Sequence, residues 1–89
     1  MSDLADLPGL GPKSAAMLAD ANIRTVATLR KLGAVQAFLA VKRCDPRASL
    51  NLLWALEGAL TGRHWQDVAR EDRARLLMAL DDAMRFEAR

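Results

Sequence analysis

The residues with the clearest chemical potential lie near the N-terminus, where two glycines stand one residue apart between two prolines. The stretch reads Leu7-Pro8-Gly9-Leu10-Gly11-Pro12-Lys13-Ser14, and an alanine-rich run without a further helix breaker follows it. Glycine adopts backbone conformations that other residues avoid, and proline suits the first helical position because an N–H would have no partner there. The pattern therefore predicts a tight turn that leads into a helix beginning at Pro12.

This turn would place several backbone N–H groups at the positive end of the helix, and the Lys13 side chain adds a full charge. Such an arrangement suits a phosphate group and needs no catalytic residue. We interpret the stretch from Gly9 to Ser14, called the Gly9–Ser14 segment below, as a candidate phosphate site. Its residues are Gly9, Leu10, Gly11, Lys13 and Ser14. The alternative is that the glycines only tighten a corner between two helices and that Lys13 is simply solvated.

The same stretch resembles the helix-hairpin-helix motif. The matching positions are Leu4 and Leu7 in a short first helix, Pro8 to Gly11 in the hairpin, Ala15 and Leu18 in the second helix, and Ile23 as the closing apolar residue. The resemblance covers about residues 3–23. It implies that the hairpin amides hold a nucleic-acid backbone phosphate without reading the base sequence.

Length and composition restrict the class of protein. The 89 residues suffice for one domain with one core, which we expect to span residues 1–89, and the 52% hydrophobic content argues against disorder. No segment approaches the ~20 apolar residues of a membrane span, and the start Met1-Ser2-Asp3 lacks the basic region of a signal peptide. The single cysteine, Cys44, cannot form an internal disulfide. We therefore expect a cytoplasmic protein with no membrane partner.

Positive charge is concentrated in the first half of the chain. Residues 1–44 carry six basic and three acidic side chains, whereas residues 45–89 carry seven basic and eight acidic ones. This asymmetry has the direction of an electrostatic footprint for nucleic acid, although an ordinary solvated surface is the alternative. The candidate flanking contacts to phosphates are Arg24, Lys42, Arg43 and Arg47.

Hydrophobic spacing and breaker residues predict helices only. We expect helices over about 3–7, 12–21, 25–33, 34–43, 49–60 and 70–87, and a connector over 63–68 whose Trp65 and Val68 fold back on the core. Thr25 would cap the helix that Gly33 stops, with Val26, Leu29 and Leu32 on one face. The inner side of the last helix would carry Arg73, Leu76, Leu77, Leu80 and Met84.

The helix over 49–60 is apolar nearly all the way round, which is typical of a helix surrounded by others, so we place it at the centre of the core. The expected fold class is therefore all-α, a compact bundle of five or six short helices with an N-terminal helix-hairpin-helix.

The remaining reactive side chains form no recognisable catalytic or metal-binding set. Cys44 and His64 are single, and a Ser14 nucleophile would need a base near it. We expect no enzymatic activity, no metal and no cofactor. Glu57 stands inside the apolar helix, and because an unpaired buried carboxylate is costly, it must reach solvent or meet a cation such as Arg63 or Lys42.

The second half of the chain carries a more specific resemblance. The residues that carry it are Leu50-Asn51-Leu52-Leu53-Trp54-Ala55-Leu56-Glu57-Gly58-Ala59-Leu60-Thr61-Gly62-Arg63-His64-Trp65. At its distance from residues 7–33, this string resembles the C-terminal domain of the TfoX/Sxy family of bacterial competence regulators. The resemblance covers almost the whole chain. It implies a small all-helical domain in a family linked to DNA uptake and to transcriptional activation of competence genes. Members that regulate competence commonly carry this domain after an N-terminal one.

Two functions of different classes remain open from the sequence. The first is a nucleic-acid-binding module that uses the Gly9–Ser14 segment to hold DNA weakly and without sequence preference. The second is a protein-interaction module that keeps the hairpin only as architecture. Its partner would be a regulatory protein or a second copy of the chain in a homodimer.

Overall fold

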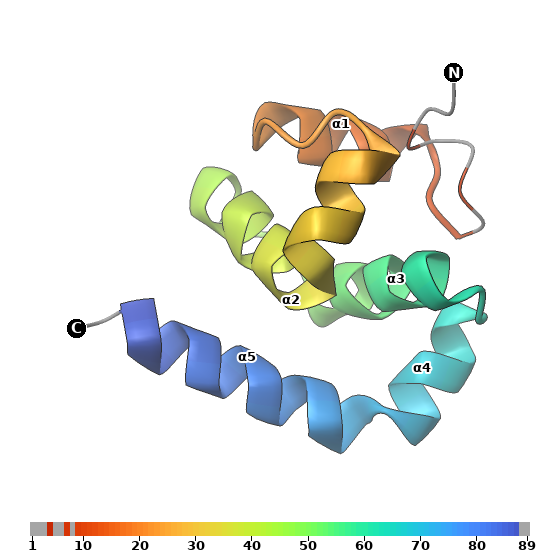
Figure 1. Ribbon diagram of the computed structural model, residues 1–89, viewed down its shortest axis with the longest axis vertical. Helices are drawn as coiled ribbons and strands as arrows, with labels where there is room; N and C mark the ends of the chain where they lie inside the picture. Colours follow the sequence, from red (N-terminus) through yellow and green to blue (C-terminus); the bar gives the residue numbers. More distant parts are fainter. Residues whose placement is uncertain (1–3, 5–6, 8, 88–89) are drawn as a thin grey trace.

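The computed structural model describes residues 4, 7 and 9–87. Helices make up this part of the chain, and no strand occurs among the described residues. The helices are α1 (Pro12–Asp20), α2 (Val26–Cys44), α3 (Leu50–Thr61), α4 (Trp65–Glu71) and α5 (Arg73–Glu87). In Figure 1, α1 and α5 lie on opposite sides of α2 and α3, and α4 joins the end of α3 to the start of α5. The predicted all-α fold is confirmed.

Helix α3 supplies the centre of the core, as its apolar pattern predicts. Leu53 and Leu56 are fully buried and Trp54 is 3% exposed. Burial of each such side chain contributes about 1.5–3 kcal/mol, so a helix buried on several sides dominates the stability of a small domain. The other helices and the α1–α2 connection contribute the fully buried residues Leu18, Ile23, Leu29, Val41, Val68 and Leu76.

Helix α2 contains the break that the sequence predicts at Gly33. The backbone there has φ 81° and ψ 166°, a conformation that favours glycine, and Thr25 caps the helix by accepting the Thr28 N–H at 3.1 Å. Leu32, however, is 41% exposed whereas Val26 and Leu29 are buried, so the expectation that all three share one face is wrong for Leu32. Each step of three residues falls about 60° short of a full helical turn. Leu32 is therefore rotated by about 120° from Val26.

The region after α3 differs from the predicted connector and single long helix. Gly62, with φ 72°, ends α3, and α4 and α5 are separated by a break at Asp72. Arg73 is exposed and Met84 is 53% exposed, so the predicted inner face is wrong at its two ends. The core face of α5 is formed by Leu76 and Leu80.

Two further expectations concern the ends of the chain and the membrane. The predicted helix over residues 3–7 includes residues outside the described part, so the helix-hairpin-helix motif as a whole stays a prediction. Within the described residues, no helix has the length and apolar character needed to cross a bilayer.

Candidate nucleic-acid interface

The Gly9–Ser14 segment forms the turn before α1. Gly9 has φ 86°, in the left-handed region, and the helix begins at Pro12 as predicted. Gly11 takes the N-cap position and has no side chain with which to cap the first-turn N–H groups of Lys13 and Ser14. The Leu10 N–H instead donates to the Leu7 carbonyl oxygen at 3.1 Å, and Leu10 is 4% exposed. Leu10 is therefore a core residue and not one of the free donors that the sequence predicts.

A groove of about 620 Å³ opens beside this segment, and three parts of the chain form its walls. One wall is the start of α1, the second is the α2–α3 connection with one face of α3, and the third is the first residue of α4. Its size lies within the ~300–1,000 Å³ range of ligand sites. The lining residues are Gly9, Lys13, Ser14, Met17, Asp45, Arg47, Ala48, Ser49, Asn51, Leu52, Ala55 and Trp65.

The start of α3 faces the same groove as the start of α1. Ser49 takes the N-cap position that the sequence predicts, but its hydroxyl makes no capping bond. Each helix N-terminus carries a partial positive charge of about half an elementary charge. The groove is therefore bounded by two positive helix ends, an arrangement that only the tertiary fold reveals.

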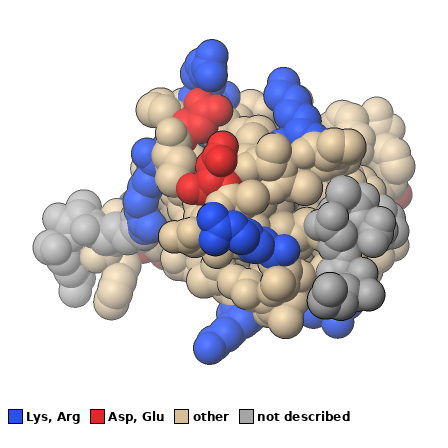
Figure 2. Space-filling view, turned by 90° about the horizontal axis from the view of Figure 1, so that it is seen from above, with Lys and Arg blue, Asp and Glu red and all other residues tan. Residues whose placement is uncertain are grey.

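The four predicted flanking cations have different surroundings. Arg47 lines the groove with a 92% exposed side chain, and its Nε donates to Asp45 Oδ1 at 3.3 Å. Lys42 instead supports the α2–α3 connection, because its Nζ donates to the carbonyl oxygens of Pro46 at 2.8 Å and Ala48 at 2.7 Å. The exposed residues Arg24 and Arg43 do not line the groove. Figure 2 shows the α1 side of the molecule, where basic side chains are spread around the face and acidic ones gather in one part of it.

Asp45 places one negative charge on the groove. The pKa of its carboxyl is lowered, chiefly by the hydrogen bond from the Arg47 backbone N–H, so the carboxylate is ionised at neutral pH. The same carboxylate orients the Arg47 guanidinium.

Trp65 forms the aromatic wall of the groove. Its side chain is 37% exposed, in contrast to Val68, which is fully buried, so the prediction that both fold back on the core holds only for Val68. The His64 ring stacks on the indole with 5.9 Å between centroids and an interplanar angle of 27°. His64 also caps α4, because its Nδ1 accepts the Gln66 N–H at 3.1 Å.

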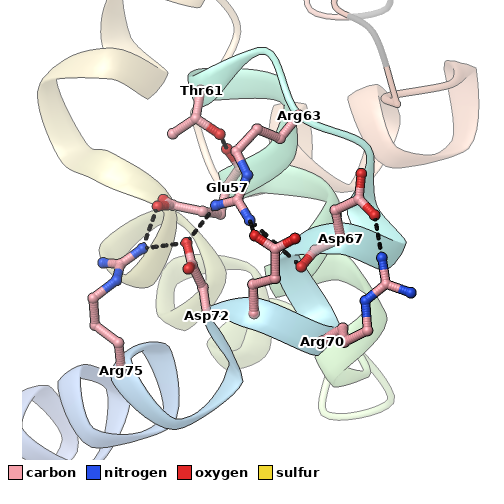
Figure 3. A network of polar contacts seen from close by, with 8 residues as sticks. Glu57, Thr61, Arg63, Asp67, Arg70, Asp72 and Arg75 are labelled. Carbon is pink, nitrogen blue, oxygen red and sulfur yellow. Dashed lines mark hydrogen bonds and ion pairs between the residues drawn. The ribbon is translucent and has the colours of Figure 1, made fainter.

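A polar network fixes α4 and α5 against α3 (Figure 3). The Glu57 carboxylate accepts from Arg75 at 2.8 Å, so the expectation that it meets a cation is confirmed, although the cation is neither Arg63 nor Lys42. Arg75 also donates to Asp72 at 2.9 Å, and Asp72 accepts from Arg63 at 2.6 Å. Arg63 in turn binds Glu71 at 3.0 Å.

The network shifts the pKa of Asp72 and of Arg75. The hydrogen bond from Arg75, followed by that from Arg63, lowers the pKa of Asp72, and the bonds to Asp72 and Glu57 raise the pKa of Arg75. Asp72 and Arg75 are therefore ionised at neutral pH. The network holds together the break at Asp72, where no helical continuity joins α4 to α5.

The remaining residues singled out in the sequence have ordinary surroundings. Cys44 is exposed, and its Sγ lies 3.7 Å from the Asp20 carbonyl oxygen. Within the described part of the chain, neither Cys44 nor His64 belongs to a cluster of three side chains that could hold a metal ion.

Comparison with known proteins identifies similar chains. Residues 1–80 match the family described as the TfoX C-terminal domain. The chain is 33% identical over 85 residues to the DNA transformation protein TfoX of Haemophilus influenzae; the match covers 96% of this chain and 39% of that protein. The chain thus spans about two fifths of the length of this relative.

Two crystal structures of Listeria monocytogenes proteins share the fold. An uncharacterized protein in a triclinic form gives a TM-score of 0.81 at 28% identity and covers 93% of this chain and 94% of its own. A protein of unknown function in a tetragonal form gives a TM-score of 0.77 at 31% identity and covers 84% of this chain and 93% of its own.

Proposed function

The chain belongs to the TfoX C-terminal domain family, and from this premise we propose that it is a non-enzymatic regulatory module with a role in bacterial competence. We propose further that it binds nucleic-acid backbones weakly, without sequence preference, at the Gly9–Ser14 segment. The relative from Haemophilus influenzae is a DNA transformation protein, which supports a role connected with DNA.

The observation that carries the binding proposal is the groove at which two helix starts, Lys13 and Arg47 come together. Backbone N–H groups at a helix start suit phosphate oxygens, and the two cations add charge attraction. Phosphate contacts fix a protein on nucleic acid but do not read its sequence. With so few contacts, the dissociation constant should fall in the non-specific range of ~10⁻⁴ to 10⁻⁶ M.

A titration of fluorescently labelled DNA by anisotropy at two salt concentrations tests this proposal. The parent protein should bind at low salt and lose affinity steeply at higher salt, because phosphate binding releases counterions. Lys13→Ala should lower the slope of log affinity against log salt by about 0.7–0.9, the value for one phosphate contact, and Lys13→Glu should weaken binding further.

The matched control is Lys31→Glu, which makes the same charge change at an exposed position of α2 that does not line the groove. It should weaken binding much less than Lys13→Glu. Absence of binding by the parent at low salt, or equal binding by the parent and Lys13→Glu, would overturn the proposal.

A protein-interaction module is the second candidate function, and α5 carries the observation that favours it. Met78 is 69% exposed and Phe86 is 76% exposed, and helical spacing places Met78 on the side of α5 opposite the core-facing Leu76 and Leu80. A contiguous apolar patch on the surface of a monomer is typical of a site that binds a protein, and we propose that these two side chains contribute to one. The partner would be a regulatory protein or a second copy of the chain.

A further inference from the structure

The groove combines an exposed aromatic ring with positive charge, and a duplex cannot contact both with a free base face and its phosphates. It is a concave site of about 620 Å³ with an exposed indole on one wall and cations on the others. Bases inside a duplex have both faces covered by their neighbours. Only an unpaired base can present a free face to an aromatic side chain beside a cationic groove, which is how proteins hold single strands.

Trp65 is positioned for such stacking. It is the first residue of α4 and lines the groove, and the His64 ring stacks on its indole with 5.9 Å between the centroids. The other tryptophan, Trp54, is 3% exposed, which leaves Trp65 as the indole available to a ligand.

The cations that could hold phosphates share the groove with Trp65. Lys13 and Arg47 line the same groove, and Asp45 orients the Arg47 guanidinium. Asp45 also opposes a phosphate by its own charge, so the attraction depends on Arg47 and Lys13 together. An acidic peptide would meet the cations but would leave the indole without a stacking partner.

We propose that this groove binds single-stranded nucleic acid, with an unpaired base stacked on Trp65 and neighbouring phosphates held by Lys13 and Arg47. The inference rests on the proposed nucleic-acid binding and specifies its ligand.

The test compares a labelled oligothymidylate of about 12 nucleotides, within the ~4–16 nucleotides of a single-strand site, with a duplex of equal length. The parent should bind the single strand about fivefold or more tightly than the duplex, as expected for one stacked base. Trp65→Ala should remove this preference, and Trp65→Phe should retain part of it. Leu32→Ala, which shortens an exposed apolar side chain outside the groove, should behave like the parent.

Tryptophan fluorescence of the parent protein tests the same inference without any substitution, so it does not depend on whether a variant folds. The single strand should protect Trp65 from quenching by acrylamide, and failure to protect it would overturn the inference. Equal affinity for single strand and duplex, or effective competition by polyglutamate of matched charge, would also overturn it. If duplex binding persists in these cases, the proposed function survives; if neither DNA binds, both proposals fail.

Discussion

Gly58 lies where the end of α3 meets the turn to α4, and adding a methyl group there should destabilise the fold. A Cβ on Gly58 would lie 2.5 Å from the Arg63 carbonyl oxygen and 3.4 Å from the Trp65 backbone nitrogen. Both are backbone atoms, so no side-chain rotation relieves the contact. The Arg63 N–H donates to the Gly58 carbonyl oxygen at 2.9 Å, which ties the turn to the helix at this point. The close approach at Gly58 is thus made within the chain.

Two opposing contributions decide the sign of the change. Alanine gains about 1 kcal/mol over glycine in helix propensity. Forcing the turn away from the new methyl group costs about 1–3 kcal/mol as overpacking, and weakening the Arg63 bond adds about 1 kcal/mol. We expect Gly58→Ala to lose about 1–3 kcal/mol of unfolding free energy, which lowers Tm by about 4–24 °C for a domain of this size.

Thermal and urea unfolding followed by circular dichroism measure this loss. Asn51→Ala is the matched control, because it raises helix propensity at an exposed position of the same helix without adding a contact. The control should melt at or above the parent temperature. If Gly58→Ala does the same, the steric argument is refuted and the turn has room to move.

Three other predictions concern the core, the polar network and self-association. Trp54→Ala should cost about 3–5 kcal/mol, and an unchanged thermal melt would show that α3 is peripheral. The pKa of Asp72 is lowered from 3.8, so its stabilisation is present above that pH and lost as pH falls through the folded-state pKa. Urea unfolding measured from neutral to acidic pH should therefore show that Asp72→Asn is less stable than the parent at neutral pH. The variant should also lose less unfolding free energy than the parent on acidification, and equal losses would contradict this. Light scattering at high micromolar concentration should detect a dimer formed through exposed apolar surface such as Met78 and Phe86, and monomer mass alone would exclude it.

The spacing of apolar residues along the chain predicts its helices, but it does not predict the break between α4 and α5. Thr25 and Gly33 mark boundaries that depend on the residues beside them, and the structure has both. Residues 65–87 contain neither glycine nor proline, so the sequence indicates no break at Asp72. There the chain departs from the helix while Asp72 binds two arginines, one of them nine residues earlier, and pairing at that distance is a tertiary effect.

The candidate site was predictable only in part, for a similar reason. Glycine and proline locate the start of α1, and Lys13 does line the groove. The contributions of Ser49 and Trp65 depend on how α3 and α4 pack against that start, which spacing along the chain does not encode. Charge alone could not distinguish the role of Lys42 from that of Arg47. What separates them is the loop conformation that offers two carbonyl oxygens to the Lys42 ammonium.

The two halves of the groove have separate supports. Lys42 and Asp45 hold the α2–α3 connection that presents Arg47, whereas the Trp65 half depends on the network around Glu57. Glu57 comes two residues after the groove-lining Ala55, about 200° round α3, so this network acts from the side of the helix away from the groove. A change in the network therefore reaches the groove only by moving α4 and its indole, and it leaves the cations in place. The proposed phosphate attraction and the proposed base stacking consequently rest on separate parts of the structure, and we expect a variant that loses the stacking to keep the attraction.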